Sequence, residues 1–385
     1  MRRFAVPVIA TVLVSVVGLQ TSAQAGVIFA SNFSELSSAI NAANLDPGST
    51  IYLAPGTYSG GELPNILANL SIFLDPAFGA PAGSAVLNTT PTGKKGLLTV
   101  PSGLSNISLS VDGLTFQNAA ISNADGGNAA GIRFQSAGPS SLLVTNSTFL
   151  GNQNGILTGF GAPLIDEELM VSISNSLFAN NGSGSGQTHG IYIFGESLEV
   201  TNSIFCGTNV GHDIKARTAI TTVTGSSFYD GIAGPDSRCG IGSASYSIDL
   251  PNGGQGILDD NDFFQGAAGE NFAIISYGAE GIAYPTNTLS VTDSVFQSTI
   301  SGRGIQQLTN GVPTCITPVQ LANNVFSANL TPVVPADCIA GPGPDPDPDP
   351  TPVDEPGTAW LMIVVLMGLG WQHHRRSRIA AAIRH

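Results

Sequence analysis

Two cations stand close together in a chain that has few of them. Lys215 and Arg217 lie two positions apart, and only seven of the 13 Lys and Arg residues lie outside the terminal segments. On a β-strand this spacing puts both side chains on one face, where an ammonium and a guanidinium group can bind one carboxylate. The alternative interpretation is that they form charge pairs on a flat face with Asp213, Asp249 or Glu199.

Imidazole and phenol groups flank this segment at similar spacing. His189 and His212 are 23 residues apart, and Tyr246 stands at the equivalent place one repeat later. Strand alternation would point all three side chains inward as a buried polar stack. A corner of the chain at these positions would instead turn the rings outward, where they could take part in chemistry.

Two repeated patterns organise the chain around these residues. The first is centred on Ile132, Ile156, Ile191, Ile214, Ile248, Ile275 and Ile305. The second resembles Val-x-Asn-x-x-Phe and ends at Phe149, Phe178, Phe205, Phe296 and Phe326, with weaker copies ending at Phe116, Phe228 and Phe263. Phe-to-Phe spacings of 23 to 35 residues without a helical pattern predict a single-stranded parallel β-helix, right-handed because parallel crossovers almost always are.

A short helix is expected to cover the open end of this all-β solenoid. Residues 33–43 carry apolar side chains at helical spacing, with Ser34 as the expected N-cap. Residues 51–58 (IYLAPGTY) then predict a strand and a turn. A helix before an I-x-L-x-P-G-x-Y segment resembles the start of many pectate-lyase-like β-helix proteins, and this resemblance implies the same fold.

Alignment of the isoleucines stacks the residues that follow them into one outward-facing ladder. This ladder comprises Arg133, Leu157, Tyr192, Lys215, Asp249, Ser276 and Gln306. Neighbouring coils lie about 4.8 Å apart, so the chemically rich members Tyr192, Lys215 and Asp249 should converge. Asp213 and Arg217 share the outward parity of Lys215 and should join them.

Four segments between residues 189 and 281 resemble a set of largely uncharacterised bacterial right-handed β-helix proteins. They begin at His189, Gly211, Ser245 and Ser276 and fall on consecutive coils. That set implies no particular activity. The broader pectate-lyase-like superfamily is rich in polysaccharide lyases, hydrolases and epimerases, so the resemblance favours a carbohydrate-active protein by analogy of fold.

The residues themselves support β-elimination on an extracellular acidic polysaccharide. The reaction removes a proton α to a uronate carboxylate, and this proton becomes more acidic when cations neutralise the carboxylate. Lys215, with a pKa lowered by Arg217, would be the base. Arg217 would bind the carboxylate, and His212 or Tyr246 would protonate the leaving oxygen. Asp249 completes the expected catalytic set.

Asp213 and Asp249 are carboxylates one coil apart on the same predicted face. Together they could hold Ca²⁺, the one cofactor that the sequence suggests, or they could act as the carboxylate pair of a glycosidase. The expected substrate-binding residues are polar or aromatic groups of the same coils: His189, Tyr192, Tyr246, Asn252, Tyr277 and Glu280.

Composition narrows the classes of partner. The formal net charge is −14 and only 10% of residues are charged, which argues against a nucleic-acid partner because phosphate binding needs a basic surface. The alternative to an enzyme is a non-catalytic glycan-binding or structural protein of the cell surface or extracellular matrix. Scarce exposed aromatic platforms favour that alternative.

The N-terminus predicts export. Residues 1–25 contain Arg2-Arg3, an apolar run and an Ala-Gln-Ala cleavage site, which together indicate a secretory signal peptide. The β-helix domain is then expected over residues 26–340.

The C-terminus predicts sorting. Residues 341–352 form a Pro/Asp-rich linker. Residues 353–385, an apolar segment followed by a basic end, resemble a PEP-CTERM signal, although Asp354 replaces an expected proline and the apolar run is short for a membrane span. The resemblance implies an exosortase-type partner, transient anchoring in the membrane and a location at the cell surface or outside the cell. A plain membrane anchor is the alternative.

Four cysteines in an exported chain allow three pairings. We predict Cys206–Cys239 and Cys315–Cys338, because the members of each pair lie within about one coil of each other. Unpaired, buried thiols are the alternative, which export disfavours.

Overall fold

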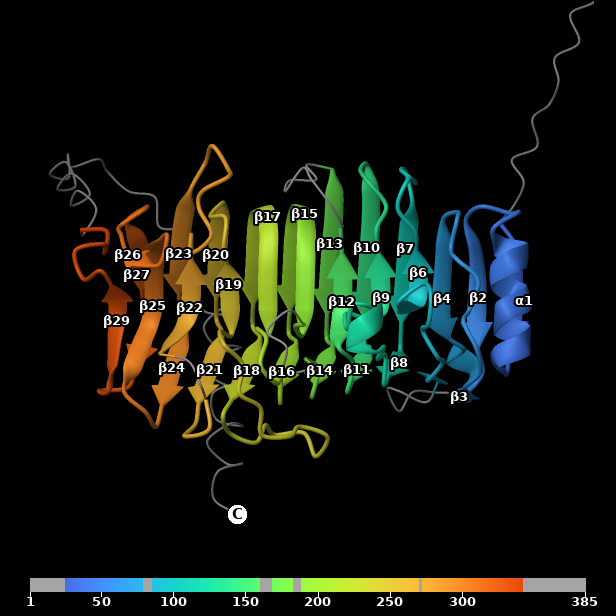
Figure 1. The fold of residues 1–385 in the computed structure, drawn as a ribbon, viewed down its shortest axis with the longest axis horizontal. Coiled ribbons are helices and arrows are strands. Elements are labelled where there is room, and N and C mark those ends of the chain that lie inside the picture. Colours follow the sequence, from blue (N-terminus) through green and yellow to red (C-terminus); the bar gives the residue numbers. More distant parts are fainter. Residues whose placement is uncertain (1–24, 79–84, 160–167, 183–187, 270–271, 342–385) are drawn as a thin grey trace, which may run out of the picture. The chain divides into compact units, whose positions relative to one another are not determined.

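The fold is a single-stranded, right-handed parallel β-helix with one helix at its N-terminal end, as predicted (Figure 1). The computed structural model describes residues 25–78, 85–159, 168–182, 188–269 and 272–341. Nearly all the predicted signal peptide, nearly all of the linker and the whole sorting segment lie outside these residues. Within the described residues, no helix is long and apolar enough to cross a membrane.

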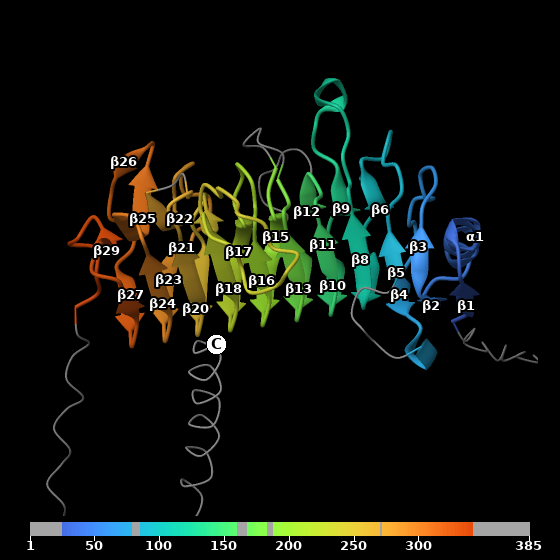
Figure 2. The same cartoon turned by 90° about the horizontal axis from the view of Figure 1, so that it is seen from below.

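The strands form three parallel ladders, two of which share long strands and make one 19-stranded sheet (Figures 1 and 2). The first ladder comprises β6 (Gly96–Val100), β9 (Ala130–Phe134), β12 (Asn154–Thr158), β15 (Ile191–Thr201), β17 (Ile214–Thr224), β19 (Ile248–Leu250), β22 (Ala273–Tyr277), β25 (Gly302–Thr309) and β29 (Leu330–Val334). The second comprises β1 (Val27–Ala30), β2 (Ser49–Leu53), β4 (Leu70–Leu74), β7 (Ser108–Asp112), β10 (Ser140–Thr145), β13 (Leu169–Ser174), the later parts of β15 and β17, β20 (Gln255–Asp259), β23 (Thr288–Thr292) and β27 (Val319–Ala322).

The third ladder is a separate 10-stranded sheet of short strands. It comprises β3 (Gly56–Tyr58), β5 (Ala85–Leu87), β8 (Leu114–Gln117), β11 (Thr148–Leu150), β14 (Leu177–Ala179), β16 (Ile204–Cys206), β18 (Ser227–Asp230), β21 (Asp262–Gln265), β24 (Val295–Ser298) and β28 (Val325–Phe326). Strand β26 (Val312–Pro313) pairs antiparallel with β25, and two short 3-10 helices, η1 (Pro76–Phe78) and η2 (Asn123–Asp125), lie in loops.

The phenylalanines of the second sequence pattern stack inside the coils. Consecutive rings from Phe116 to Phe326 have centroids 4.4 to 5.1 Å apart and are stacked, with angles of 1 to 20° between their planes. The isoleucines of the first pattern face them from the first ladder and are fully buried. Each coil therefore adds one aromatic and one aliphatic layer to a continuous core.

The asparagines of the second pattern lie at a corner between strands. Asn146, Asn175 and Asn202 adopt positive φ of 48 to 50°, a conformation that asparagine tolerates better than most residues. A serine follows each of them, and these hydroxyls continue between coils: the Ser147 N–H donates to Ser176 Oγ at 3.2 Å, and the same bond recurs in the next coils. This inward serine ladder was not predicted.

The N-terminal helix α1 (Phe33–Ala43) covers the first coil, and its buried side chains are Leu36, Ala39, Ile40 and Ala43. Its N-cap is Asn32, whose side chain accepts a hydrogen bond from the Glu35 N–H at 3.0 Å. The predicted N-cap Ser34 was wrong by two residues, because helical backbone geometry already begins at Phe33.

Both predicted disulfides are present. Cys206–Cys239 has an S–S distance of 2.01 Å and Cys315–Cys338 one of 2.07 Å. The first ties β16 to the long loop that follows β18, and the second ties the last coils together. The pairing of cysteines about one coil apart is thus confirmed.

The phenylalanine stack should carry much of the stability. Phe178→Ala should lower the free energy of unfolding by about 3–5 kcal/mol, because the ring is fully buried between two others. Phe272→Ala, at a side chain 72% exposed, should change it by less than about 0.5 kcal/mol. Urea unfolding of both variants measures this, and equal losses would contradict the role of the stack.

Candidate functional site

The predicted outward ladder is confirmed by the strand register. Lys215 of β17 pairs with Tyr192 on one side and Asp249 on the other. The same alignment continues to Arg133 and Leu157 in one direction and to Ser276 and Gln306 in the other. Three chemically distinct side chains therefore meet on adjacent coils because each directly follows a buried isoleucine.

Strand parity fails just before each isoleucine, where the chain turns a corner. Asp213 aligns with Gly190 and Gly155, and a Cβ at Gly155 would meet the Phe178 ring at 2.8 Å. Asp213 therefore points into the coil and is fully buried, contrary to the outward position predicted for it. The preceding residue, His212, points outward instead, because alternation restarts at Ile214.

His189, His212 and Tyr246 stack in the predicted order but face the site. The centroids of the two imidazole rings are 4.8 Å apart, and the His212 and Tyr246 centroids are 5.1 Å apart. His212 Nε2 lies 3.5 Å from Asp249 Oδ2. The inward orientation expected for these three side chains from strand alternation was wrong. The alternative, in which a corner of the chain turns the rings outward, is the one observed.

The centre of the site is an ion cluster of Lys215, Arg217, Asp249 and Glu280. Lys215 Nζ lies 3.2 Å from Asp249 Oδ2 and donates a hydrogen bond of 2.6 Å to Glu280 Oε1. Arg217 donates to the other oxygen of the same carboxylate, Glu280 Oε2. One glutamate thus binds both cations at once.

Arg217 is held on all sides. Its Nε donates to the Tyr192 hydroxyl at 2.9 Å, and another guanidinium nitrogen donates to Asn252 Oδ1. Its guanidinium carbon lies 5.5 Å from the centroid of the Phe194 ring. Asn252 in turn donates to the Gly281 carbonyl at 3.0 Å. The planar group is therefore positioned by contacts from three coils.

The structure corrects the predicted role of Lys215 as a base. Burial is the largest single influence and lowers the pKa of Lys215, but Asp249 and Glu280 together raise it above its ordinary value. Lys215 is therefore an ammonium ion at neutral pH and cannot accept a proton. It is also 9% exposed, so it is not the surface lysine that parity suggested.

The pKa values of the neighbouring Asp249 and His212 are both shifted in the direction that favours the neutral form. Burial raises the pKa of Asp249, against the opposing charge of Lys215. Burial and then the charge of Lys215 lower the pKa of His212 to about 3. His212 is thus a neutral imidazole, which corrects the prediction that it would protonate a leaving oxygen.

The pair Asp213 and Asp249 does not form. Asp213 faces the interior near Thr208 and Asp230, whereas Asp249 contacts Lys215 and His212 on the other side of the backbone. Among the described residues no group of three or more His, Cys, Asp or Glu could hold a metal ion. The predicted Ca²⁺ ligands and the predicted glycosidase pair were therefore both wrong.

Tyr277 also lies outside the site. Its side chain is fully buried, and its hydroxyl donates to the Gly254 carbonyl at 2.6 Å. It cannot bind substrate as predicted. Ser276, its neighbour, was not selected from the sequence although it aligns with Asp249. The ladder itself carried that signal, as it did for Gln306, whose amide donates to the Tyr246 hydroxyl at 3.0 Å.

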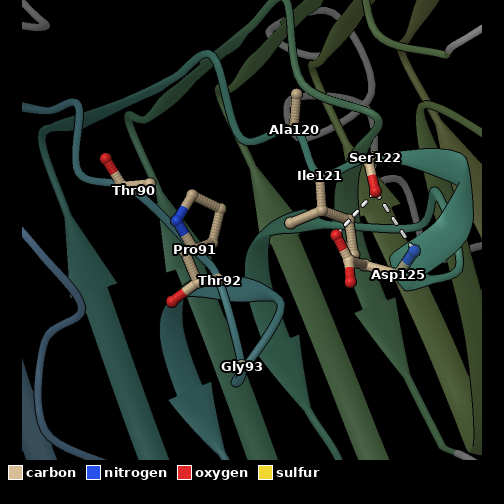
Figure 3. A pocket seen from close by; sticks show the side chains of 8 residues that line it. All are labelled: Thr90, Pro91, Thr92, Gly93, Ala120, Ile121, Ser122 and Asp125. Atoms are coloured by element: carbon tan, nitrogen blue, oxygen red, sulfur yellow. Dashed lines mark hydrogen bonds between the residues drawn. The ribbon is translucent and has the colours of Figure 1, made fainter.

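A pocket lies away from the ion cluster, between the loops around Thr92 and Ser122 (Figure 3). Its one acid, Asp125, accepts a hydrogen bond of 2.6 Å from the Ser122 hydroxyl. No histidine, cysteine or cation is among its lining residues. It therefore lacks the chemistry found at the ion cluster.

Comparison with known proteins yields likeness in solved structures only. No family model matches the chain, and no curated protein sequence matches it. A pectin methyl esterase of the rice weevil overlaps 84% of this chain and 92% of its own, at 11% identity and a TM-score of 0.35. The A-module of the mannuronan C-5 epimerase AlgE4 of Azotobacter vinelandii overlaps 80% and 94%, at 13% identity and a TM-score of 0.33. Likeness of this degree says nothing about the substrate of this chain.

Asp213 should make the protein less stable at alkaline pH. Burial raises the pKa of Asp213 well above its ordinary value, so the folded state retains a proton that the unfolded chain releases above about pH 4. The contribution of Asp213 to stability is therefore fully present below about pH 4 and is lost as the pH rises toward its folded pKa.

Asp213→Asn removes this titration. The free energy of unfolding should therefore fall less between pH 5 and pH 9 in Asp213→Asn than in the native protein. Denaturant unfolding at both pH values measures the difference. Asp337→Asn, at an exposed position, serves as the control. Parallel pH profiles for the native chain and Asp213→Asn would contradict the buried neutral acid.

Proposed function

We propose that this protein is a carbohydrate-active enzyme that cleaves an acidic polysaccharide by β-elimination at the ion cluster. The observation that carries the proposal is the meeting of two buried cations, Lys215 and Arg217, with a buried acid of raised pKa, Asp249, on adjacent coils. Few charges are available in this domain, and their concentration at one place favours chemistry over decoration of a flat face.

The two cations would bind the carboxylate of a uronate sugar. Arg217 offers a planar group fixed by Tyr192 and Asn252, and Lys215 adds an ammonium ion beside it. Neutralising the carboxylate increases the acidity of the proton on the adjacent carbon. Here Lys215 acts as a cation, not as the base.

Asp249 is then the residue suited to remove the proton. Its pKa is raised by burial, which makes its carboxylate a stronger base than that of an ordinary aspartate. The C–H electrons form the double bond, the bond to the leaving oxygen breaks, and that oxygen takes a proton. Burial raises the pKa of Tyr246, so its phenol stays protonated and is the proposed donor.

The proposed setting is outside the cell. The predicted signal peptide and sorting segment support export and handling by an exosortase-type enzyme at the membrane. The two disulfides support an oxidising compartment. The proposed partner there is an extracellular polysaccharide that carries carboxylates.

A non-catalytic glycan-binding or structural protein is the second candidate. The observation that favours it is that the site is closed: Arg217 is 6% exposed, and the Glu280 carboxylate already binds both Lys215 and Arg217. Such a protein would bind uronate chains without forming unsaturated products. The experiments below separate the two candidates.

Removal of Arg217 should abolish turnover. Activity on a panel of uronate polysaccharides is followed by the absorbance of unsaturated products. The kcat/KM of Arg217→Ala should be at least about 100-fold lower than that of the native protein, the magnitude typical of a lost electrostatic contact in the transition state. Arg133→Ala is the matched control, because Arg133 is a buried arginine of the same face two coils before Tyr192. Equal activity of Arg217→Ala and native protein, with both folded by circular dichroism, would reject the proposed site.

The rate should depend on an ionised Asp249. Because the pKa of Asp249 is raised from 3.8, its proton is retained to higher pH than in an ordinary aspartate, and kcat/KM should fall as pH drops through that raised value. Asp249→Asn should have no measurable turnover at any pH. Activity that persists in Asp249→Asn would assign the base elsewhere, and absence of turnover in the native protein on every uronate polymer would favour the second candidate.

A further inference from the structure

Glu280 occupies the place where a substrate carboxylate would bind. Its two oxygens are divided between Lys215 and Arg217, one to each. The two cationic side chains are 11% and 8% exposed, whereas the Glu280 side chain is 44% exposed. The carboxylate thus lies between the buried cations and solvent, where it covers them.

The Glu280 backbone is fixed but its side chain is not enclosed. The Glu280 N–H donates to the Pro251 carbonyl at 2.9 Å, and the Ala283 N–H donates to the Asn252 carbonyl at 3.0 Å. These bonds hold the loop after β22 to the loop after β19. Rotation of the exposed side chain alone, without movement of the loop, would therefore uncover the cations.

Polar groups beneath this carboxylate are gathered on adjacent coils around Lys215. Asp249, His212 and Ser276 are buried there. The Ser276 hydroxyl forms a hydrogen bond with Asp249, but His212 Nδ1 makes no hydrogen bond with any described residue. A buried polar atom without a partner is costly unless something else binds to it. This open position beside the cations is consistent with a second arrangement of the site in which a ligand is bound.

Charge balance identifies what can replace Glu280. If its side chain moves away, Lys215 keeps Asp249, whereas Arg217 keeps its uncharged partners Tyr192 and Asn252. A partly buried cation without a carboxylate is unfavourable. A neutral sugar cannot restore the balance, whereas a ligand with a single carboxylate can.

We propose that Glu280 is an internal carboxylate that closes the uronate subsite, and that an acidic sugar binds by displacing it from Lys215 and Arg217. This inference rests on the proposed function, since it assigns the substrate class of the same site. Glu280 is then a specificity residue: neutral glycans cannot displace it, because they offer no charge in exchange. On this proposal Glu280 competes with the substrate for the cations, whereas it was expected from the sequence to bind the substrate.

The test is binding, measured without turnover. Glu280→Ala should bind D-galacturonate at least tenfold more tightly than the native protein in calorimetry, because the internal competitor is absent. Acetate should raise the melting temperature of Glu280→Ala, since a ligand that binds the folded state stabilises it, and it should leave the native protein unchanged. D-galactose should have no effect on either protein. Glu280→Gln keeps the shape of the side chain and should show the same gain in binding. It replaces Glu280→Ala in the test if that variant does not fold.

Two controls locate the effect. Glu199→Ala removes an exposed glutamate of β15 that is not part of the ion cluster, and it should behave as the native protein. Adding Arg217→Ala to Glu280→Ala should abolish the gain.

Weaker or unchanged galacturonate binding in both Glu280 variants would overturn the proposal and make Glu280 a structural residue. Tighter galacturonate binding by the Glu280 variants, together with a native protein that has no turnover, would sustain this inference while rejecting β-elimination.

Discussion

Every coil of this protein is fixed to the next by the same contacts, and the site depends on that repetition. Parallel backbone pairing aligns Ile191, Ile214 and Ile248 across three coils, and stacked phenylalanines on the opposite side prevent any slip of the register. A slip by one residue would exchange inward and outward side chains over a whole strand. The outward position after each isoleucine is consequently constant, and a functional group is introduced there by substitution alone.

Burial of the cations is the second constraint. A guanidinium and an ammonium ion on the outside of a β-helix would normally be solvated and would contribute little. Here the loops after β19 and β22 cover them and supply Asn252 and Glu280. Desolvation strengthens each electrostatic contact, and it makes a carboxylate partner necessary because an unpaired buried cation is unfavourable. The concentration of charge and the cover over it therefore depend on each other.

Features that repeat from coil to coil could be predicted from the sequence, whereas features that occur once could not. The isoleucine and phenylalanine series predicted the fold, the ladder through Lys215 and Asp249, and both disulfides, because a solenoid repeats one local rule. Parity failed at Asp213 and His212, since the corner before β17 has no strand geometry and no residue in the sequence marks it. The raised pKa of Lys215 was missed because Asp249 was treated as a possible metal ligand rather than as its counter-ion, and because Glu280, 65 residues away, also pairs with it.

The same ladder offers a comparison within one molecule. Arg133 occupies the position equivalent to Lys215 and is also buried, and it donates hydrogen bonds to the Gln135 side chain and the Asn128 carbonyl. Lys215 is paired with two carboxylates. Asp249 lies on the next coil, and Glu280 reaches the cations from a loop that the fold does not require. Ion pairs that only decorate a surface would be expected to lie in open solvent, with one acid beside each cation. A covered cluster in which the half-exposed carboxylate of Glu280 binds two buried cations is better explained by an exchange of carboxylates at this point.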